Sequence, residues 1–143
     1  MPFVPFYEHF PKIARHETRS IVVFPRSGSD MPSGEYSFIE MFCNEKGCDC
    51  RRVFFYVVSV PGDKLQAVVA YGWESPDFYA QWLKSENYRD IAEMQGPVLN
   101  FGSPQSPNAP AVLNLVKNTL LKDPHYVERV KRHYNIFRDK IDQ

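Results

Sequence analysis

The chain of 143 residues carries 17 Lys and Arg against 17 Asp and Glu, so its formal charge at pH 7 is zero. This balance argues against a dedicated polyanion-binding protein, because phosphate neutralisation needs a clustered excess of cations. Hydrophobic residues make up 43% of the chain, enough for one packed domain over residues 1–143. No apolar run approaches the roughly 18 residues that span a bilayer, and the first residues lack the pattern of a signal peptide. We therefore expect a single cytoplasmic domain with no membrane segment.

The first half of the chain predicts β-strands. After a proline-containing lead-in that is irregular or briefly helical, β-branched and apolar segments alternate with turn residues. Strands are expected at residues 18–24, 35–42, 51–60 and 65–73. Because most of the intervening turns are short, these four strands are expected to pair in order as an antiparallel meander.

From Ser75 onward the spacing of apolar residues becomes helical. An N-cap serine, a first-position proline and an acid follow one another at residues 75–77. Three or four helices are expected between residues 75 and 141. The last of them carries an apolar stripe at steps of three and four residues: Val127, Val130, Tyr134, Phe137 and Ile141. Strands followed by helices indicate an α+β fold, with the helices packed on the meander.

Three cysteines, Cys43, Cys48 and Cys50, lie within eight residues. An odd number of cysteines in a chain without a leader speaks against a disulfide framework, and the C-x4-C-x-C spacing favours a metal site. Gly47 permits a positive-φ turn around an ion, and the two arginines at 51–52 offset thiolate charge. Thiolate ligands prefer zinc, with iron as the second choice. The alternatives are three buried thiols, a C-D-C redox pair, and a Cys–His nucleophile.

Three cysteine ligands leave one tetrahedral position for a fourth ligand, and two histidines are candidates. If the first two strands form a hairpin, Cys43 lies across from about residues 16–17, which places His16 near the cluster. His133 flanks the apolar stripe of the last helix, so its ring is able to face inward. We take His133 as the predicted fourth ligand and His16 as its alternative.

The segment CDCRR follows a strand that ends in F-x-E-x-F-C, and the combination resembles a family of uncharacterised prokaryotic proteins that share C-x4-C-D-C-R-R. The resemblance covers this strand, the loop and the next strand, with further likeness in the late segment ERVKRHY. It implies metal binding at most, with Cys43, Cys48, Cys50 and Arg51 forming one unit, and it slightly favours His133 as the fourth ligand. It implies no catalytic role.

Basic residues gather toward the C-terminus, where the ordinary interpretation is a solvated helix face. The other interpretation is a surface for a nucleic-acid or protein partner, with Arg129, Lys131 and Arg132 as its contacts. No nucleotide-binding, metalloprotease or serine-hydrolase motif occurs. We therefore expect an accessory or interaction module with a structural zinc loop, rather than an enzyme. The alternative is a metal- or thiol-dependent enzyme with the cysteine loop at its active site, which would keep an open coordination position.

Overall fold

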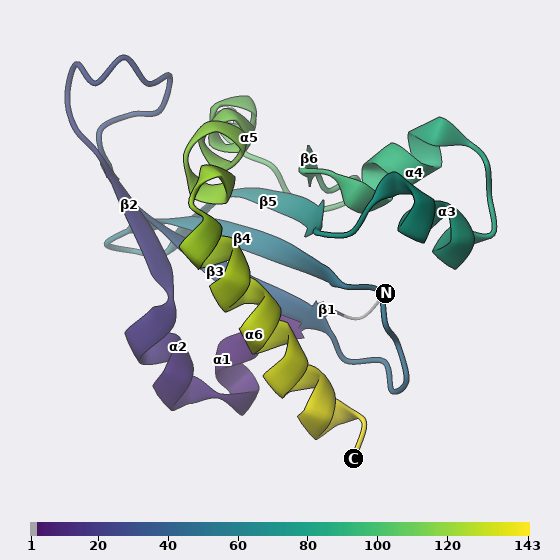
Figure 1. Ribbon diagram of the computed structural model, residues 1–143. Helices are drawn as coiled ribbons and strands as arrows, with labels where there is room; N and C mark the ends of the chain where they lie inside the picture. Colours follow the sequence, from purple (N-terminus) through teal and green to yellow (C-terminus); the bar gives the residue numbers. More distant parts are fainter. Residues whose placement is uncertain (1–2) are drawn as a thin grey trace.

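The computed structural model describes residues 3–143 as an antiparallel six-stranded sheet with helices packed against it (Figure 1). The strands are β1 (Phe3–Pro5), β2 (Arg19–Val23), β3 (Gly34–Cys43), β4 (Arg52–Val60), β5 (Lys64–Gly72) and β6 (Val98–Leu99). The helices are α1 (Phe6–His9), α2 (Pro11–Glu17), α3 (Pro76–Leu83), α4 (Tyr88–Gln95), α5 (Ala109–Asn118) and α6 (Pro124–Ile141), with a 3₁₀ turn at Leu120–Lys122. The predicted α+β class is confirmed. No helix among these residues is long and apolar enough to cross a membrane.

The predicted order of four strands followed by helices is matched only in part. Strands β2, β3, β4 and β5 pair consecutively, but β1 also pairs with β3, and β6 adds to β5. Helices α1 and α2 lie in the chain between β1 and β2, and α3 and α4 lie between β5 and β6. The meander is therefore the centre of a larger sheet, and helices are interleaved with its outer strands.

The pairing of Cys43 differs from the sequence prediction. Strand β2 pairs with β3 only as far as Arg19 opposite Phe38, and β1 then takes its place with Phe3 opposite Cys43. Residues 16–17 do not face Cys43 across a hairpin, because they form the end of α2. Pro11 in the first turn of α2 favours this helix.

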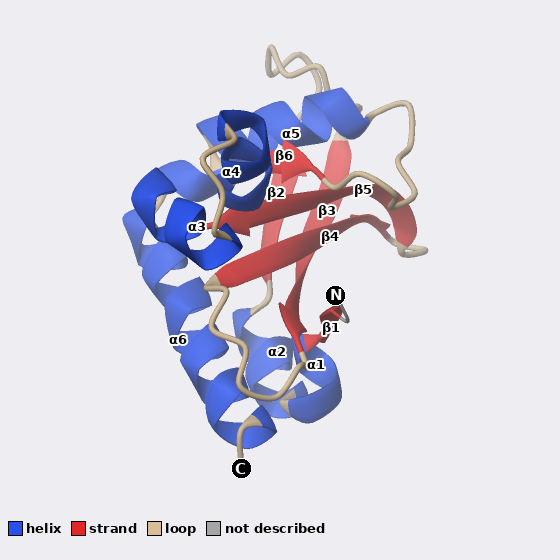
Figure 2. Ribbon diagram, turned by 90° about the vertical axis from the view of Figure 1, so that its right-hand side faces the viewer, coloured by secondary structure: helices blue, strands red, loops and turns tan. Residues whose placement is uncertain are grey.

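The two faces of the sheet are covered differently. In β3 and β4, Phe38, Phe42, Val53 and Phe55 are fully buried in the core that α5 and α6 complete. The side chains that alternate with them are only half-buried: Ile39, Met41, Phe54 and Tyr56. Figure 2 shows α6 on one side of the sheet, whereas on the other side α3 and α4 lie at one end of the strands and leave the middle of β3 and β4 uncovered. We call this second side the open face.

Helix α6 supplies the side chains that connect the core to the cysteine loop. Its buried side chains are Tyr126, Val130, His133, Tyr134, Phe137 and Arg138. Val130, Tyr134 and Phe137 belong to the predicted stripe, whereas Val127 and Ile141 are half-buried. The ring of Phe137 lies 5.6 Å from that of Phe42 on β3. The stripe therefore packs on the sheet. Two buried polar residues lie next to members of the stripe in the sequence, with His133 directly before Tyr134 and Arg138 directly after Phe137.

Candidate metal centre

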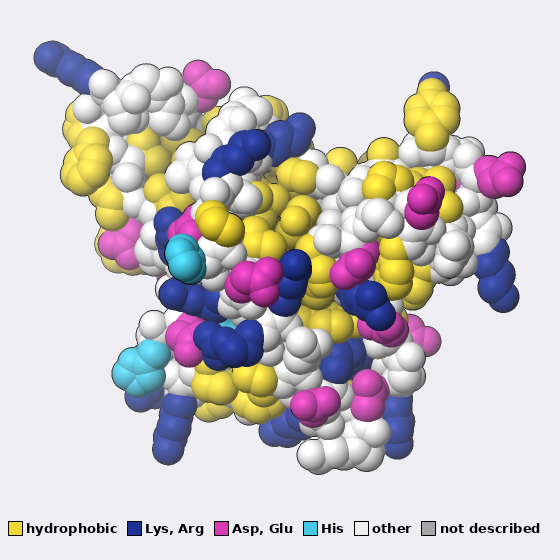
Figure 3. Space-filling view, viewed as in Figure 1, with side chains coloured by type: hydrophobic (Ala, Val, Ile, Leu, Met, Phe, Trp, Pro, Cys, Tyr) yellow, Lys and Arg dark blue, Asp and Glu magenta, His cyan; other side chains and the backbone are white. Residues whose placement is uncertain are grey.

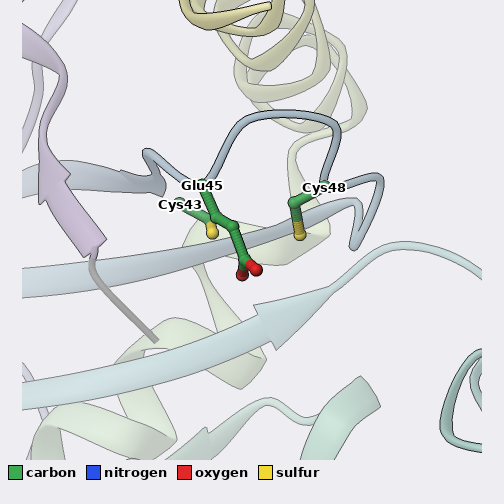
Figure 4. Close-up of side chains that lie close together, drawn as sticks. All are labelled: Cys43, Glu45 and Cys48. Atoms are coloured by element: carbon green, nitrogen blue, oxygen red, sulfur yellow. The ribbon is translucent and has the colours of Figure 1, made fainter.

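The cysteine loop, residues 43–50, connects β3 to β4 and gathers three potential metal ligands. The Sγ atoms of Cys43 and Cys48 and a carboxylate oxygen of Glu45 all lie within 4.8 Å of one another. In Figure 4 the three side chains point to the same side of the loop. Cys43 ends β3 and is buried, Cys48 is partly exposed and Glu45 is exposed. The group of potential ligands therefore runs from a buried thiol, Cys43, to a carboxylate at the surface, Glu45.

The third cysteine lies beside this group. Cys50 is fully buried, and the Cys48 thiol interacts with the thiols of both Cys43 and Cys50. Burial raises the pKa of all three thiols, and each is raised further by the charge of a neighbouring cysteine. Three thiolates therefore form together only when a cation offsets their repulsion.

The cysteine loop is a tight turn. The amide of Cys48 donates to the carbonyl of Glu45 over 3.2 Å, and Gly47 between them has φ of 80°. This is the left-handed conformation expected for Gly47, since a side chain at that position would be strained. The turn brings Cys48 back toward Cys43, which is five residues earlier in the chain.

The C-terminal end of α6 holds the loop from outside. Arg138 donates to the carbonyl oxygens of Cys48 (2.8 Å) and Glu45 (3.2 Å), and Asp142 accepts from the amide of Gly47 (2.7 Å). These bonds orient the loop backbone toward α6. Sequence reasoning missed Arg138, Asp142 and Glu45, because a charged residue on a terminal turn or loop looks like an ordinary solvated one.

Two tyrosines fix the other end of the loop at Arg51. Tyr134 accepts from the Arg51 amide over 3.1 Å, and Tyr79 on α3 donates to the Arg51 carbonyl over 2.8 Å. A Cβ at Gly72 would lie 2.2 Å from the Tyr79 hydroxyl oxygen, so the glycine makes room for this bond. Burial raises the pKa of both tyrosines, so they stay neutral at ordinary pH.

The two predicted arginines have different environments. Arg51 pairs with Asp49 over 2.9 Å and with Glu74 over 3.7 Å, so its charge is already balanced. The charge of Arg52 instead acts on Cys50, whose pKa it lowers against the larger effect of burial. Arg138 acts on Cys43 in the same sense. Arg52 and Arg138 are therefore the cations that favour thiolates in the loop.

The predicted histidine ligands lie elsewhere. His133 is buried between two carboxylates, with Nδ1 2.7 Å from Glu40 and Nε2 2.9 Å from Glu17, and its ring stacks on Phe6. His16 is exposed on α2. The structure brings Glu45 next to Cys43 and Cys48, and it brings neither histidine into that group.

The three basic residues predicted to contact a partner make contacts within the chain. Arg129 donates to the carbonyl of Glu17 over 3.2 Å, Arg132 forms an ion pair with the Glu17 carboxylate, and Lys131 lies 3.4 Å from Glu128. Hydrogen bonds from Arg132 and His133 lower the pKa of the Glu17 carboxyl, and this effect outweighs the rise that burial causes. Figure 3 shows basic and acidic side chains interspersed over the face that α6 covers.

No family model, no curated protein and no solved structure matches the chain. The likeness of the C-x4-C-D-C-R-R segment to a prokaryotic family stays a prediction. Function is therefore inferred from the chain's own geometry and chemistry.

Proposed function

We propose that this chain binds one zinc ion through Cys43, Cys48 and Cys50, and that the ion has a structural role in an accessory or interaction module. The observation that carries the proposal is the group formed by Cys43, Glu45 and Cys48, whose ligand atoms lie within 4.8 Å of one another. A tetrahedral zinc ion bound at about 2.0–2.3 Å needs ligand atoms roughly 3.3–3.8 Å apart. Cys50 lies outside this group, so its Sγ would have to move toward the other three ligand atoms when zinc binds.

Glu45 is the fourth ligand that we propose in place of a histidine. Zinc accepts carboxylate oxygen at the same range of distances as imidazole nitrogen. His133 would first have to give up its hydrogen bonds to Glu17 and Glu40, and Glu40 would then stay buried without them. Glu45 is exposed and has no such cost. His133 and His16 remain the alternatives that the experiment below separates.

The proposed role of the ion is to fix the β3–β4 connection under the end of α6. Arg138 and Asp142 already bind the backbone of the loop. The ion would in addition join the loop's cysteine and glutamate side chains to one another. Ligand binding to the native state alone stabilises that state by mass action. Zinc would therefore raise the stability of the whole domain.

The enzyme alternative has one observation in its favour. Glu45 is exposed, so a substrate or water has access to its coordination position. A zinc site with three protein ligands and one exchangeable position is typical of catalysis, whereas four protein ligands are typical of structure. X-ray absorption of the zinc-loaded protein distinguishes the two, because only the structural site lacks a bound water.

The test is the metal content of protein purified without chelators. We expect about one equivalent of zinc by elemental analysis, and we expect Cys48→Ser to lower zinc content and thermal stability together. Lys46→Ser is the matched control, since Lys46 is exposed in the same loop and lies outside the ligand group. Glu45→Gln, His133→Gln and His16→Gln, made singly, identify the fourth ligand.

Well under one equivalent of any transition metal in the wild-type protein would contradict the proposal. The cysteines would then be buried thiols or a redox pair, and the loop would depend on Arg138 and Asp142 alone.

A further inference from the structure

A groove of about 690 Å³ lies at the open face, between the sheet and α4. Its apolar lining includes Phe3, Phe54, Leu83, Met94, Leu99 and Phe101. The rings of Phe3 and Phe54 are stacked in parallel, with centroids 3.8 Å apart. A concave apolar surface of this volume is in the usual range for small-molecule sites.

Arg52 supplies a buried positive charge to this groove. Only 7% of its surface is exposed, and it is one of the lining residues. Its Nε donates to the carbonyl of Met94 over 2.8 Å, and its guanidinium carbon lies 5.3 Å from the centre of the Phe54 ring. Among residues 3–143, no carboxylate lies within ion-pair distance of Arg52. The other buried basic side chains each lie within 3.7 Å of a carboxylate oxygen: His133 with Glu17 and Glu40, and Arg138 with Asp142.

A buried cation without a carboxylate partner is costly, and burial accordingly lowers the pKa of Arg52. The remaining guanidinium N–H groups are suited to a planar, two-oxygen acceptor, since arginine binds carboxylates through paired hydrogen bonds.

We propose that this groove binds a small amphipathic carboxylate, with its alkyl or aromatic body on the Phe3–Phe54 stack and its carboxylate paired with Arg52. Asp90 and Glu93 on α4 also line the groove and are exposed. Their charge repels ligands with several negative charges, so a monocarboxylate fits better than a nucleotide or polyphosphate. None of the residues that line the groove is a proposed zinc ligand, and Arg52 is the lining residue whose charge also acts on Cys50.

The charge preference is tested with octanoate and its neutral counterpart octanamide, titrated calorimetrically into the protein as purified. We expect octanoate to bind at least about 10-fold more tightly than octanamide, because only octanoate pairs with the guanidinium. Arg52→Met should bring octanoate down to the affinity of octanamide and leave octanamide unchanged. Equal affinity of the wild-type protein for the two compounds would overturn the proposal.

Because Arg52 is buried, a second pair of variants tests the location of the site without touching the core. Ser85 lines the groove from the connection between α3 and α4, whereas its neighbour Glu86 is exposed and is not a lining residue. Ser85→Trp should block the groove and abolish octanoate binding, and Glu86→Trp should bind octanoate like the wild type. Unchanged binding by Ser85→Trp would place octanoate elsewhere and overturn the proposal.

A peptide C-terminus offers the same carboxylate chemistry from another source. The tripeptide Leu-Phe-Leu with a free C-terminus should bind no more tightly than octanoate, since its ammonium group adds a charge and its backbone adds polar surface. A tripeptide affinity 10-fold above that of octanoate, lost on C-terminal amidation, would overturn the small-molecule assignment and make the groove a peptide site.

Discussion

Arg138 is the residue whose removal tests the attachment of α6 to the cysteine loop. Its guanidinium donates to the carbonyls of Cys48 and Glu45, and its Nε is buried without a hydrogen-bond partner, 3.7 Å from Asp142. Hydrogen bonds from a charged donor contribute about 1.5–3 kcal/mol each. Arg138→Met keeps most of the buried alkyl chain, so we expect a loss of about 2–4 kcal/mol in the free energy of unfolding, measured in urea.

Lys140→Met is the control for that variant, because Lys140 is an exposed residue on the same turn of α6. It should change stability by less than about 0.5 kcal/mol. Equal stability of the two variants would mean that the bonds from Arg138 to the loop contribute nothing in solution.

His133 allows a second test at the scale of single residues. It lies between Glu17 and Glu40, and Glu40 also accepts from Tyr126 over 2.8 Å. His133→Leu leaves the buried Glu40 with Tyr126 alone, so we expect a loss of about 3–5 kcal/mol. Adding Glu40→Gln to that variant should recover part of the loss, since the unpaired charge is then removed.

The same variants separate a core histidine from a zinc ligand. A folded His133→Leu protein should retain its zinc, and loss of zinc without loss of folding would identify His133 as the ligand. If His133→Leu costs less than about 1 kcal/mol, the pairing of His133 with the two glutamates is weak in solution.

The cysteines could be recognised from the sequence because their signal is their spacing along the chain. Glu45 could not, since loop acids are common and only the three-dimensional course of the loop shows that its carboxylate lies near both Cys43 and Cys48. Arg138 reaches the Cys48 carbonyl across 90 positions of sequence. A contact of that separation depends on how α6 packs on the sheet, which the local sequence does not determine.

At the scale of elements, α6 depends on the burial of Phe137. The ring is fully buried and lies 5.6 Å from that of Phe42 and 5.4 Å from that of His9. Phe137→Ala removes this packing and leaves a cavity, so we expect a loss of about 3–5 kcal/mol in urea unfolding. Asp139→Ala, at an exposed position of the same helix, should be nearly neutral. A loss below about 1 kcal/mol for Phe137→Ala would show that α6 packs loosely.

The elements recovered from the sequence are those long enough to show a period. β3, β4, β5 and α6 have 10, 9, 9 and 18 residues, and each shows alternation, a continuous apolar run or a helical stripe. β1 has 3 residues and β6 has 2, which is too few for any pattern. These two segments are strands because they pair with the free edges of β3 and β5. Such pairing depends on the tertiary fold, so the local sequence does not reveal it. The misplaced partner of Cys43 follows from the same missing strand.

At the scale of the molecule, hydrogen bonds from Arg138 and Asp142 join the cysteine loop to a distant part of the chain, whereas the proposed zinc ligands all lie within the loop itself. The loop at residues 43–50 is held by residues near the C-terminus, with bonds that span 90 to 95 positions. Zinc would close only this short loop, so its direct effect is to order residues 43–50 and the end of β3. Arg138 and Asp142 then pass that order on to the end of α6 through their bonds to the loop backbone.

The pH dependence of stability is a property of the whole molecule, because its cause is the burial of tyrosines throughout the fold. Burial is the first cause that raises the pKa of each: Tyr36, Tyr71, Tyr79, Tyr126 and Tyr134. The folded state thus keeps phenol protons that the unfolded state loses above about pH 10. Stability from these groups is fully present below that pH and is lost as pH rises further.

We therefore expect the urea midpoint to fall steeply between about pH 9.5 and 11. Tyr71→Phe should flatten this fall, because it removes one half-buried phenol for which no hydrogen-bond partner is found among residues 3–143. Tyr88→Phe is the control, since 74% of Tyr88 is exposed, and it should leave the curve as in the wild type. On the acid side, the lowered pKa values of Glu17 and Asp123 stabilise the fold above about pH 4.5, and that stability is lost as pH falls. A midpoint that stays constant from pH 7 to 11 would show that these phenols reach water in the folded protein, and that the core around the sheet is looser than its packing indicates.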